Sequence, residues 1–145
     1  MTEIKNIESM SGDQVGRALS DFGINFLVTN TEQTALFLER VFGFNRLRLD
    51  KDYGVMEHRG RLYQLHADPT YHSHPLLGLL PESDARGLGI ELRLFDIDPD
   101  EAEQRAIDNE YVVLQSTADK PHGLRECFLM DPDGYCWVPS VKLEG

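Results

Sequence analysis

Apolar residues recur at two different spacings in the first half of the chain. Between residues 31 and 44 they fall close to every 3.6 positions, which predicts an amphipathic helix. Asn30 or Thr31 can cap the start of this helix, and Gly43 can end it in the left-handed conformation. Short alternating or mostly apolar runs flank it and predict strands at residues 24–30, 44–50, 53–58 and 61–67. The expected order is one strand, one helix and three strands.

The same order returns in the second half of the chain. Asp98 can cap a helix that begins at Pro99 and runs to Asn109. Predicted strands surround this helix, at residues 87–95, 111–115, 125–130 and 135–139. The repetition lies in the pattern and not in residue identity. It predicts an α+β protein built from tandem βαβββ modules.

Weakly patterned segments flank and separate the two modules. The first residues predict an N-terminal arm or short helix, with Ser11-Gly12-Asp13 as a candidate cap. The segment between the modules contains three of the seven prolines and predicts a connecting loop. The expected organisation is an arm (1–22), a first module (23–67), a loop (68–87), a second module (88–140) and a tail (141–145).

Composition narrows the classes of partner. The 145 residues are 41% hydrophobic, which suits one domain or two small halves that share a core. Fourteen basic against 25 acidic residues give a net charge of −11, which argues against binding nucleic acid or an anionic membrane surface. A cationic or neutral ligand is easier to attract. Glu3, Glu8 and Asp13 occupy the stretch where a signal peptide needs an apolar core, so we expect a cytoplasmic protein.

Residues 131–134, Asp-Pro-Asp-Gly, predict the turn of a hairpin. Proline presets the first central turn position, and Asp-Gly supplies residues that reverse the chain. A turn symmetric about this tetrapeptide places Cys127 opposite Val138 and Cys136 opposite Leu129. We therefore expect two reduced, buried cysteines that do not face each other.

Three stretches resemble the vicinal oxygen chelate superfamily, which includes glyoxalase I, extradiol dioxygenases, fosfomycin-modifying enzymes and bleomycin-resistance proteins. They are GINFLVTNTEQTALFLERVFGF, GLGIELRLFDID and PHGLRECFLMDPDGYCW, where His122 stands at a position usually held by Trp. The resemblance covers about residues 22–140. It implies that the βαβββ modules form a curled mixed sheet with a central, U-shaped cleft.

The resemblance also implies four metal-ligand positions, one on each of four strands. In this sequence they fall at Gly23 or Asn25, near Gln64, at Gly89 or Ile90, and at Val138. A catalytic metal needs about three converging protein ligands, and these residues supply at most one good one. The closest resemblance is therefore to bleomycin-resistance proteins. We expect a homodimer that binds a small molecule in its cleft, with no catalytic residue, no metal and no other cofactor.

The candidate cleft residues are Asn25, Tyr63, Gln64, His66, Glu91, Arg93, Arg125, Trp137 and Val138. Tyr63 and Trp137 are candidates for flat walls, because each combines a large apolar surface with a polar group. Glu91 and Arg93 alternate with apolar residues, so this polar face of their strand lies either in solvent or in the cleft, with Arg125 and Glu126 as candidate partners.

Two other interpretations remain open. One is a metal-dependent lyase or dioxygenase whose ligands come from His66, Gln64 and Glu91, with or without a partner chain. The other is a protein with a vestigial cleft that serves as an interaction surface. Among the other histidines, His58 is expected to face solvent, and His72 and His74 have a spacing that can chelate a metal on a strand.

Overall fold

A computed structural model describes residues 6–70, 74–81 and 85–144 of the chain. The first sheet contains β1 (Ile24–Val28), β2 (Asn45–Leu49), β3 (Tyr53–His58) and β4 (Arg61–Ala67), in the order β1-β4-β3-β2. The second contains β5 (Glu91–Phe95), β6 (Val112–Asp119), β7 (Leu124–Met130) and β8 (Cys136–Lys142), in the order β5-β8-β7-β6. Both sheets are open and mixed, since only the β1–β4 and β5–β8 pairs are parallel. The predicted α+β fold with tandem βαβββ modules is confirmed.

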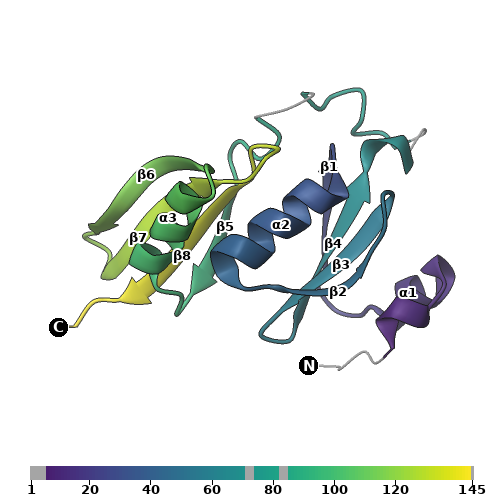
Figure 1. Cartoon of the computed structure of the whole chain (residues 1–145), viewed down its shortest axis with the longest axis horizontal. Helices are drawn as coiled ribbons and strands as arrows, with labels where there is room; N and C mark the ends of the chain where they lie inside the picture. Colours follow the sequence, from purple (N-terminus) through teal and green to yellow (C-terminus); the bar gives the residue numbers. More distant parts are fainter. Residues whose placement is uncertain (1–5, 71–73, 82–84, 145) are drawn as a thin grey trace.

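One long helix accompanies each sheet (Figure 1). Helix α2 (Thr31–Phe42) begins after Asn30, whose side chain accepts a hydrogen bond from the Gln33 amide, and ends at Gly43 with φ 73°. Helix α3 (Pro99–Asp108) begins after Asp98, whose carboxylate accepts from the amides of Asp100 and Glu101. Both predicted helices and their end signals are confirmed.

Three strand boundaries differ from the sequence prediction by three or four residues. Strand β6 continues to Asp119, because irregularities between Val113 and Ala118 let it keep pairing with β7. Strand β8 continues to Lys142, into the predicted tail, and β5 starts only at Glu91. Gly89, with φ 89°, lies in the turn that precedes β5.

The predicted register of the β7–β8 hairpin is wrong by one residue. Leu129 pairs with Trp137 and Met130 with Cys136. The Asp131 amide donates to the Tyr135 carbonyl at 3.0 Å, so the turn includes a fifth residue beyond the Asp-Pro-Asp-Gly tetrapeptide. Because side chains alternate along a strand, this register puts Cys127 and Cys136 on opposite faces of the sheet. Both thiols are free and buried.

The two modules share one apolar core. Trp137 of β8 is 0% exposed, and its ring lies 5.5 to 6.0 Å from the rings of four aromatic residues of the first module. These residues are Phe26, Phe42, Phe44 and Tyr63. The core therefore lies against the helix-bearing faces of both sheets, and α2 runs between the sheets (Figure 1). The opposite face of each sheet, which we call its open face, points away from this core.

The hairpin turn holds the modules together. Asp133 accepts hydrogen bonds from the amide and hydroxyl of Thr29, at 3.1 and 2.8 Å. The Tyr135 hydroxyl donates to the Leu27 carbonyl at 2.9 Å, and Arg86 donates to the same carbonyl at 3.0 Å. Arg86 also forms a bidentate ion pair with Asp68. Since the bonds of Asp133 and Tyr135 join the end of β1 to the β7–β8 turn, they fix the position of the second module relative to the first.

The N-terminal arm is structured. A 3-10 turn, η1 (Ile7–Ser9), precedes α1 (Gly12–Ala18), and a second such turn, η2 (Asp68–Thr70), follows β4. Ser11 caps α1 in a capping box with Gln14, as the sequence suggested. In Figure 1, α1 lies beyond β2 at the end of the molecule remote from the second sheet. None of the helices described is long and apolar enough to cross a membrane.

Candidate functional site

Three predicted cleft residues meet on the open face of the first sheet. Asn25 is the strand neighbour of Gln64, which in turn pairs with Val55. His66 lies two residues further along the same face of β4. The first open face thus carries Asn25, Leu27, Tyr53, Val55, Leu62, Gln64 and His66.

Tyr53, which sequence reasoning did not single out, links two of these residues. Its hydroxyl donates to Gln64 Oε1 at 2.9 Å, and its ring meets the His66 ring edge-on with centroids 4.5 Å apart. Burial, together with nearby His74, lowers the pKa of His66 to about 4. His66 is therefore neutral at pH 7. The face offers amides and a neutral imidazole and carries no cation of its own at these positions.

The open face of the second sheet is charged at its centre. Arg93 pairs with Glu91 at 2.9 Å and, more closely, with Glu126. Glu126 is only 2% exposed, and its other oxygen lies 3.2 Å from His122 Nε2. Burial alone would raise the pKa of Glu126, but the hydrogen bonds from Arg93 and His122 outweigh it and hold that pKa below its usual value.

Ser140 lies under this group. It is fully buried and is the strand neighbour of both Glu126 and Phe95. Its hydroxyl has no hydrogen-bond partner in the described part of the chain. Since buried polar atoms are nearly always bonded, the Ser140 hydroxyl beside the carboxylate is an exception among the described residues. We call Glu91, Arg93, His122, Glu126 and Ser140 the Arg93 cluster.

Apolar side chains surround the Arg93 cluster on the second open face. Phe95 is 55% exposed, and the Arg93 guanidinium lies 5.6 Å from its ring centroid. Phe128 is partly covered by Lys120, and Val112 is exposed at the sheet edge. A polar centre with apolar margins suits an organic ligand better than a bare ion.

Three predicted cleft residues do not reach either open face. Trp137 and Tyr63 belong to the shared core and are not cleft walls in this chain. Arg125 lies on the helix side of its sheet, where it pairs with Asp100 at 2.8 and 2.9 Å and with Asp119 at 2.9 Å. The sequence suggested Arg125 as a candidate partner of Glu91 and Arg93. In the structure, Arg125 pairs instead with Asp100 of α3 and Asp119 of β6.

His122 and Ser140 were not among the predicted site residues. Alternation along β7 and β8 could have assigned Glu126 and Ser140 to one face, but only with the correct hairpin register. His122 precedes β7, so strand periodicity says nothing about it.

The metal-ligand positions implied by the family resemblance do not fit a metal here. Asn25 and Gln64 lie side by side but offer only amides. Val138, the neighbour of Arg93, is apolar and 0% exposed. Gly89 and Ile90 precede β5, so the first side chain of that strand is Glu91. Within the described ranges, no three His, Cys, Asp or Glu side chains converge on one point.

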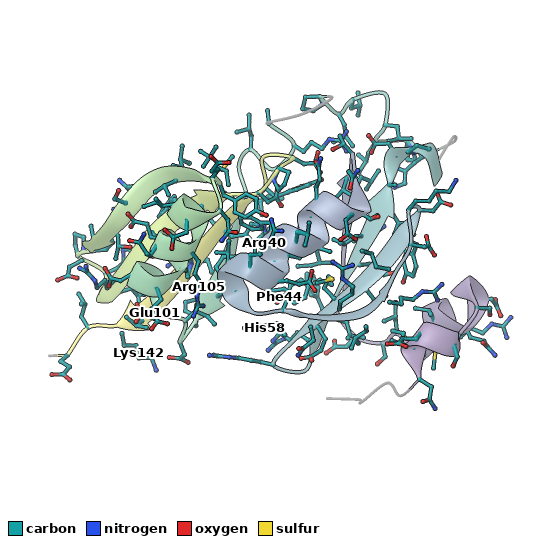
Figure 2. The ribbon with its side chains drawn as sticks, viewed as in Figure 1. Arg40, Phe44, His58, Glu101, Arg105 and Lys142 are labelled. Atoms are coloured by element: carbon teal, nitrogen blue, oxygen red, sulfur yellow. The ribbon has the colours of Figure 1, made fainter. Side chains whose placement is uncertain are left out.

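His58 and His74 are not part of either open face as defined above, although His74 lies close enough to His66 to affect its pKa. His58, expected in solvent, stacks on Phe44 with centroids 4.5 Å apart, and burial lowers its pKa. Figure 2 shows this pair below the end of α2 that carries Arg40, with Glu101 and Arg105 of α3 to its left in this view. His74 accepts a hydrogen bond from the Leu76 amide. His72 lies outside the described residues, so the structure does not test whether His72 and His74 could chelate a metal.

Two surface grooves also lie away from the Arg93 cluster. One, of about 380 Å³, is bordered by α2, the turn before β6 and the β7–β8 turn. The other, of about 480 Å³, lies between the 3-10 turn of the arm and Leu47 of β2.

Comparison with solved structures gives the class of fold. A glyoxalase/bleomycin resistance protein/dioxygenase from Nocardioides matches with a TM-score of 0.66 at 19% identity, over 92% of this chain and 91% of the other. A family enzyme of the same description from Burkholderia phytofirmans PsJN matches with a TM-score of 0.68 at 15% identity, over 83% and 96%. Lactoylglutathione lyase from Agrobacterium tumefaciens matches with a TM-score of 0.61 at 17% identity, over 84% and 92%.

No protein-family model matches the chain, and a search of curated proteins finds no significant match. The structural matches show that the chain has the fold of the glyoxalase/bleomycin resistance/dioxygenase proteins, the vicinal oxygen chelate superfamily that the sequence resembles. At these identities the likeness concerns fold, and function has to be argued from the site.

Proposed function

We propose that the protein is a ligand-binding member of this superfamily and binds a small organic molecule without a catalytic metal. The observation that carries this proposal is the second open face. There a buried carboxylate, a paired guanidinium and a buried hydroxyl lie among exposed apolar side chains. Such a surface can hold a polar group of a ligand at the centre and its apolar part at the margin.

The ligand site is completed by a second copy of the chain. Within one chain the two open faces lie on the outside of a shared core and cannot close on each other. In a homodimer, the first open face of one copy can meet the second open face of the other. The amides of Asn25 and Gln64 then lie opposite the Arg93 cluster.

The charge of the site favours a cationic or neutral ligand. Glu91 and Glu126 outnumber Arg93, and the whole chain carries a net charge of −11. Phe95 adds an exposed aromatic ring that can stack on a flat or cationic group. Basic antibiotics of the bleomycin type, which the names of the structural relatives mention, are therefore reasonable first probes.

The test is a binding screen with matched variants. Metal-free bleomycin and a panel of organic cations are titrated into the protein, with thermal shift followed by calorimetry. A bound ligand should lose affinity by tenfold or more in Glu126→Gln, because a charged hydrogen-bonding partner is worth about 1.5–3 kcal/mol. Glu101→Gln on the exposed face of α3 serves as the control and should bind normally.

Two outcomes would overturn the proposal. One is the absence of any shift across cationic, neutral and anionic panels, which points to a surface used only for protein interaction. The other is stoichiometric, tight binding of Zn, Ni, Mn or Fe that disappears in His66→Ala. That second result would restore the metal-dependent lyase or dioxygenase interpretation.

A further inference from the structure

The N-terminal arm lies against the first open face. Ile7 and Val15 are 3% and 1% exposed, and both belong to one apolar cluster with Val55 of β3. Val55 is the strand neighbour of Gln64. The partly buried members of the cluster are Met10, Leu19, Leu47, Tyr53 and Leu62. The arm thus covers the β2–β3 side of the same face that carries Asn25 and Gln64.

Polar contacts hold the arm in place. Arg48 of β2 donates to the Met10 carbonyl at 2.7 Å, and its guanidinium lies 5.2 Å from the centroid of the Tyr53 ring. The capping box between Ser11 and Gln14 fixes the start of α1, the helix that carries Val15. The arm is therefore attached by apolar contacts, through Ile7 and Val15, and by a polar contact at the Met10 carbonyl, just before the cap of α1.

Tyr53 connects the arm to the binding residues. Its ring packs in the cluster under the arm, and the same ring contacts His66. Its hydroxyl donates to Gln64 Oε1. This bond orients the Gln64 amide, so its NH₂ group is left to donate toward a ligand. Removing the arm would free the Tyr53 ring and loosen both contacts.

The arm also sets the width of the accessible surface. Leu47, Val55 and Leu62 pack in one apolar cluster with the arm residues Ile7 and Val15, and Val55 is the strand neighbour of Gln64. Without the arm, a ligand would meet a broad apolar surface instead of a narrow strip around Asn25, Gln64 and His66.

We propose that residues 6–19 form a wall of the ligand site, which positions Gln64 and His66 through Tyr53 and excludes ligands that would reach Val55. This inference rests on the proposed function, since the wall matters only if the first open face takes part in binding. The arm residues act by positioning and need not touch the ligand.

Two ligand-independent measurements test the wall. Val15→Asp places a carboxylate against Val55 and should displace the arm. Fluorescence of 8-anilinonaphthalene-1-sulfonate should then rise several-fold, because the apolar cluster becomes accessible. In an NMR titration, the His66 ring should titrate at higher pH than in the unaltered protein, because the Tyr53 ring, no longer held under the arm, covers it less. Arg17→Gln on the exposed side of α1 is the control and should change neither signal.

A second variant covers the case in which Val15→Asp fails to fold, as judged by circular dichroism. Arg48→Gln removes the guanidinium that binds the Met10 carbonyl while leaving the apolar cluster intact, so both signals should move in the same direction by a smaller amount. Unchanged dye fluorescence and an unchanged His66 titration in the folded variants would overturn the inference. Neither readout needs the physiological ligand, so failure of the ligand screen alone would count against the proposed function and not against the wall.

Discussion

The two sheets have the same strand order, yet their open faces have opposite chemistry. On the first, the chain covers apolar side chains with its own N-terminal arm and leaves a strip of amides and a neutral imidazole. On the second, the centre is a buried ion pair and the margins are exposed Phe95 and Val112. A duplicated fold has thus produced two non-equivalent halves. In the proposed site, a ligand would meet amides and a neutral imidazole on one side and an acidic, aromatic surface on the other.

The largest expected effect is on the core that both faces share. Trp137→Ala should lower the free energy of unfolding by about 3–5 kcal/mol, because Trp137 fills the space between the modules. Denaturant unfolding followed by circular dichroism and by tyrosine fluorescence should show one coincident transition. If the two modules instead unfolded in separate transitions, the two open faces would belong to independent folding units that do not share one core.

A smaller effect should separate the two faces. Glu126→Gln should lower the free energy of unfolding by about 1–3 kcal/mol, because it leaves the partly buried Arg93 with a weaker partner. Gln64→Ala, on the first face, should cost less than about 1 kcal/mol, since it removes one neutral hydrogen bond at a partly exposed site. Chemical denaturation of both variants gives the comparison. If the two variants lost the same free energy of unfolding, the buried carboxylate would contribute no more to stability than the amide does.

The pH dependence of stability should differ between the faces. The folded pKa of His66, about 4, lies below its ordinary value of 6.5, so the unfolded chain binds more protons between these values and stability falls as the pH drops through that window. The pKa of Glu126 is also lowered, so its contribution is lost only below about pH 4.5. Thermal melts of His66→Gln should lose the upper part of the acid dependence, and those of Glu126→Gln the lower part. If His66→Gln lost the lower part of the acid dependence and Glu126→Gln the upper part, the result would contradict the burial of His66.

A further pH effect concerns the turn that joins the modules and lies on neither face. Burial raises the pKa of Asp131 to about 6, although Trp137 Nε1 and two turn amides donate to its carboxylate. The folded state therefore binds this proton more tightly than the unfolded chain, and this contribution to stability is present below pH 3.8 and lost as the pH rises through 6. Between pH 4 and 7, the melting temperature of Asp131→Asn should therefore lack the decrease with rising pH that Asp131 contributes in the unaltered protein. If the melting temperature of Asp131→Asn depended on pH as that of the unaltered protein does, Asp131 would not be the group that titrates.

The sequence was sufficient for the order of helices and strands, because periodicity and helix caps are local. Asn30, Gly43 and Asp98 mark helix ends through bonds within a few residues. It was not sufficient for the β7–β8 register, since Tyr135 joins the turn through one hydrogen bond that no residue pattern announces. That register decides which residues of β8 reach the open face.

The site could be predicted only in part for a related reason. Asn25, Gln64 and His66 share a face because strand alternation is reliable within β1 and β4. Trp137 and Tyr63 were misplaced because the side of the sheet that takes the core depends on how the two modules pack. The role of the arm was invisible, since Ile7 and Val15 find their partners in a strand that lies far along the chain.

The most direct test of the central claim is a complementation experiment with ligand found in the binding screen. Gln64→Ala impairs the first open face and Glu126→Gln the second, so each variant alone should bind weakly. Unfolded together and refolded, they should form mixed dimers in which one site combines the two intact faces. Calorimetry should then show a fraction of sites with the original affinity. A mixture that binds no better than the separate variants would contradict a site shared between two copies of the chain.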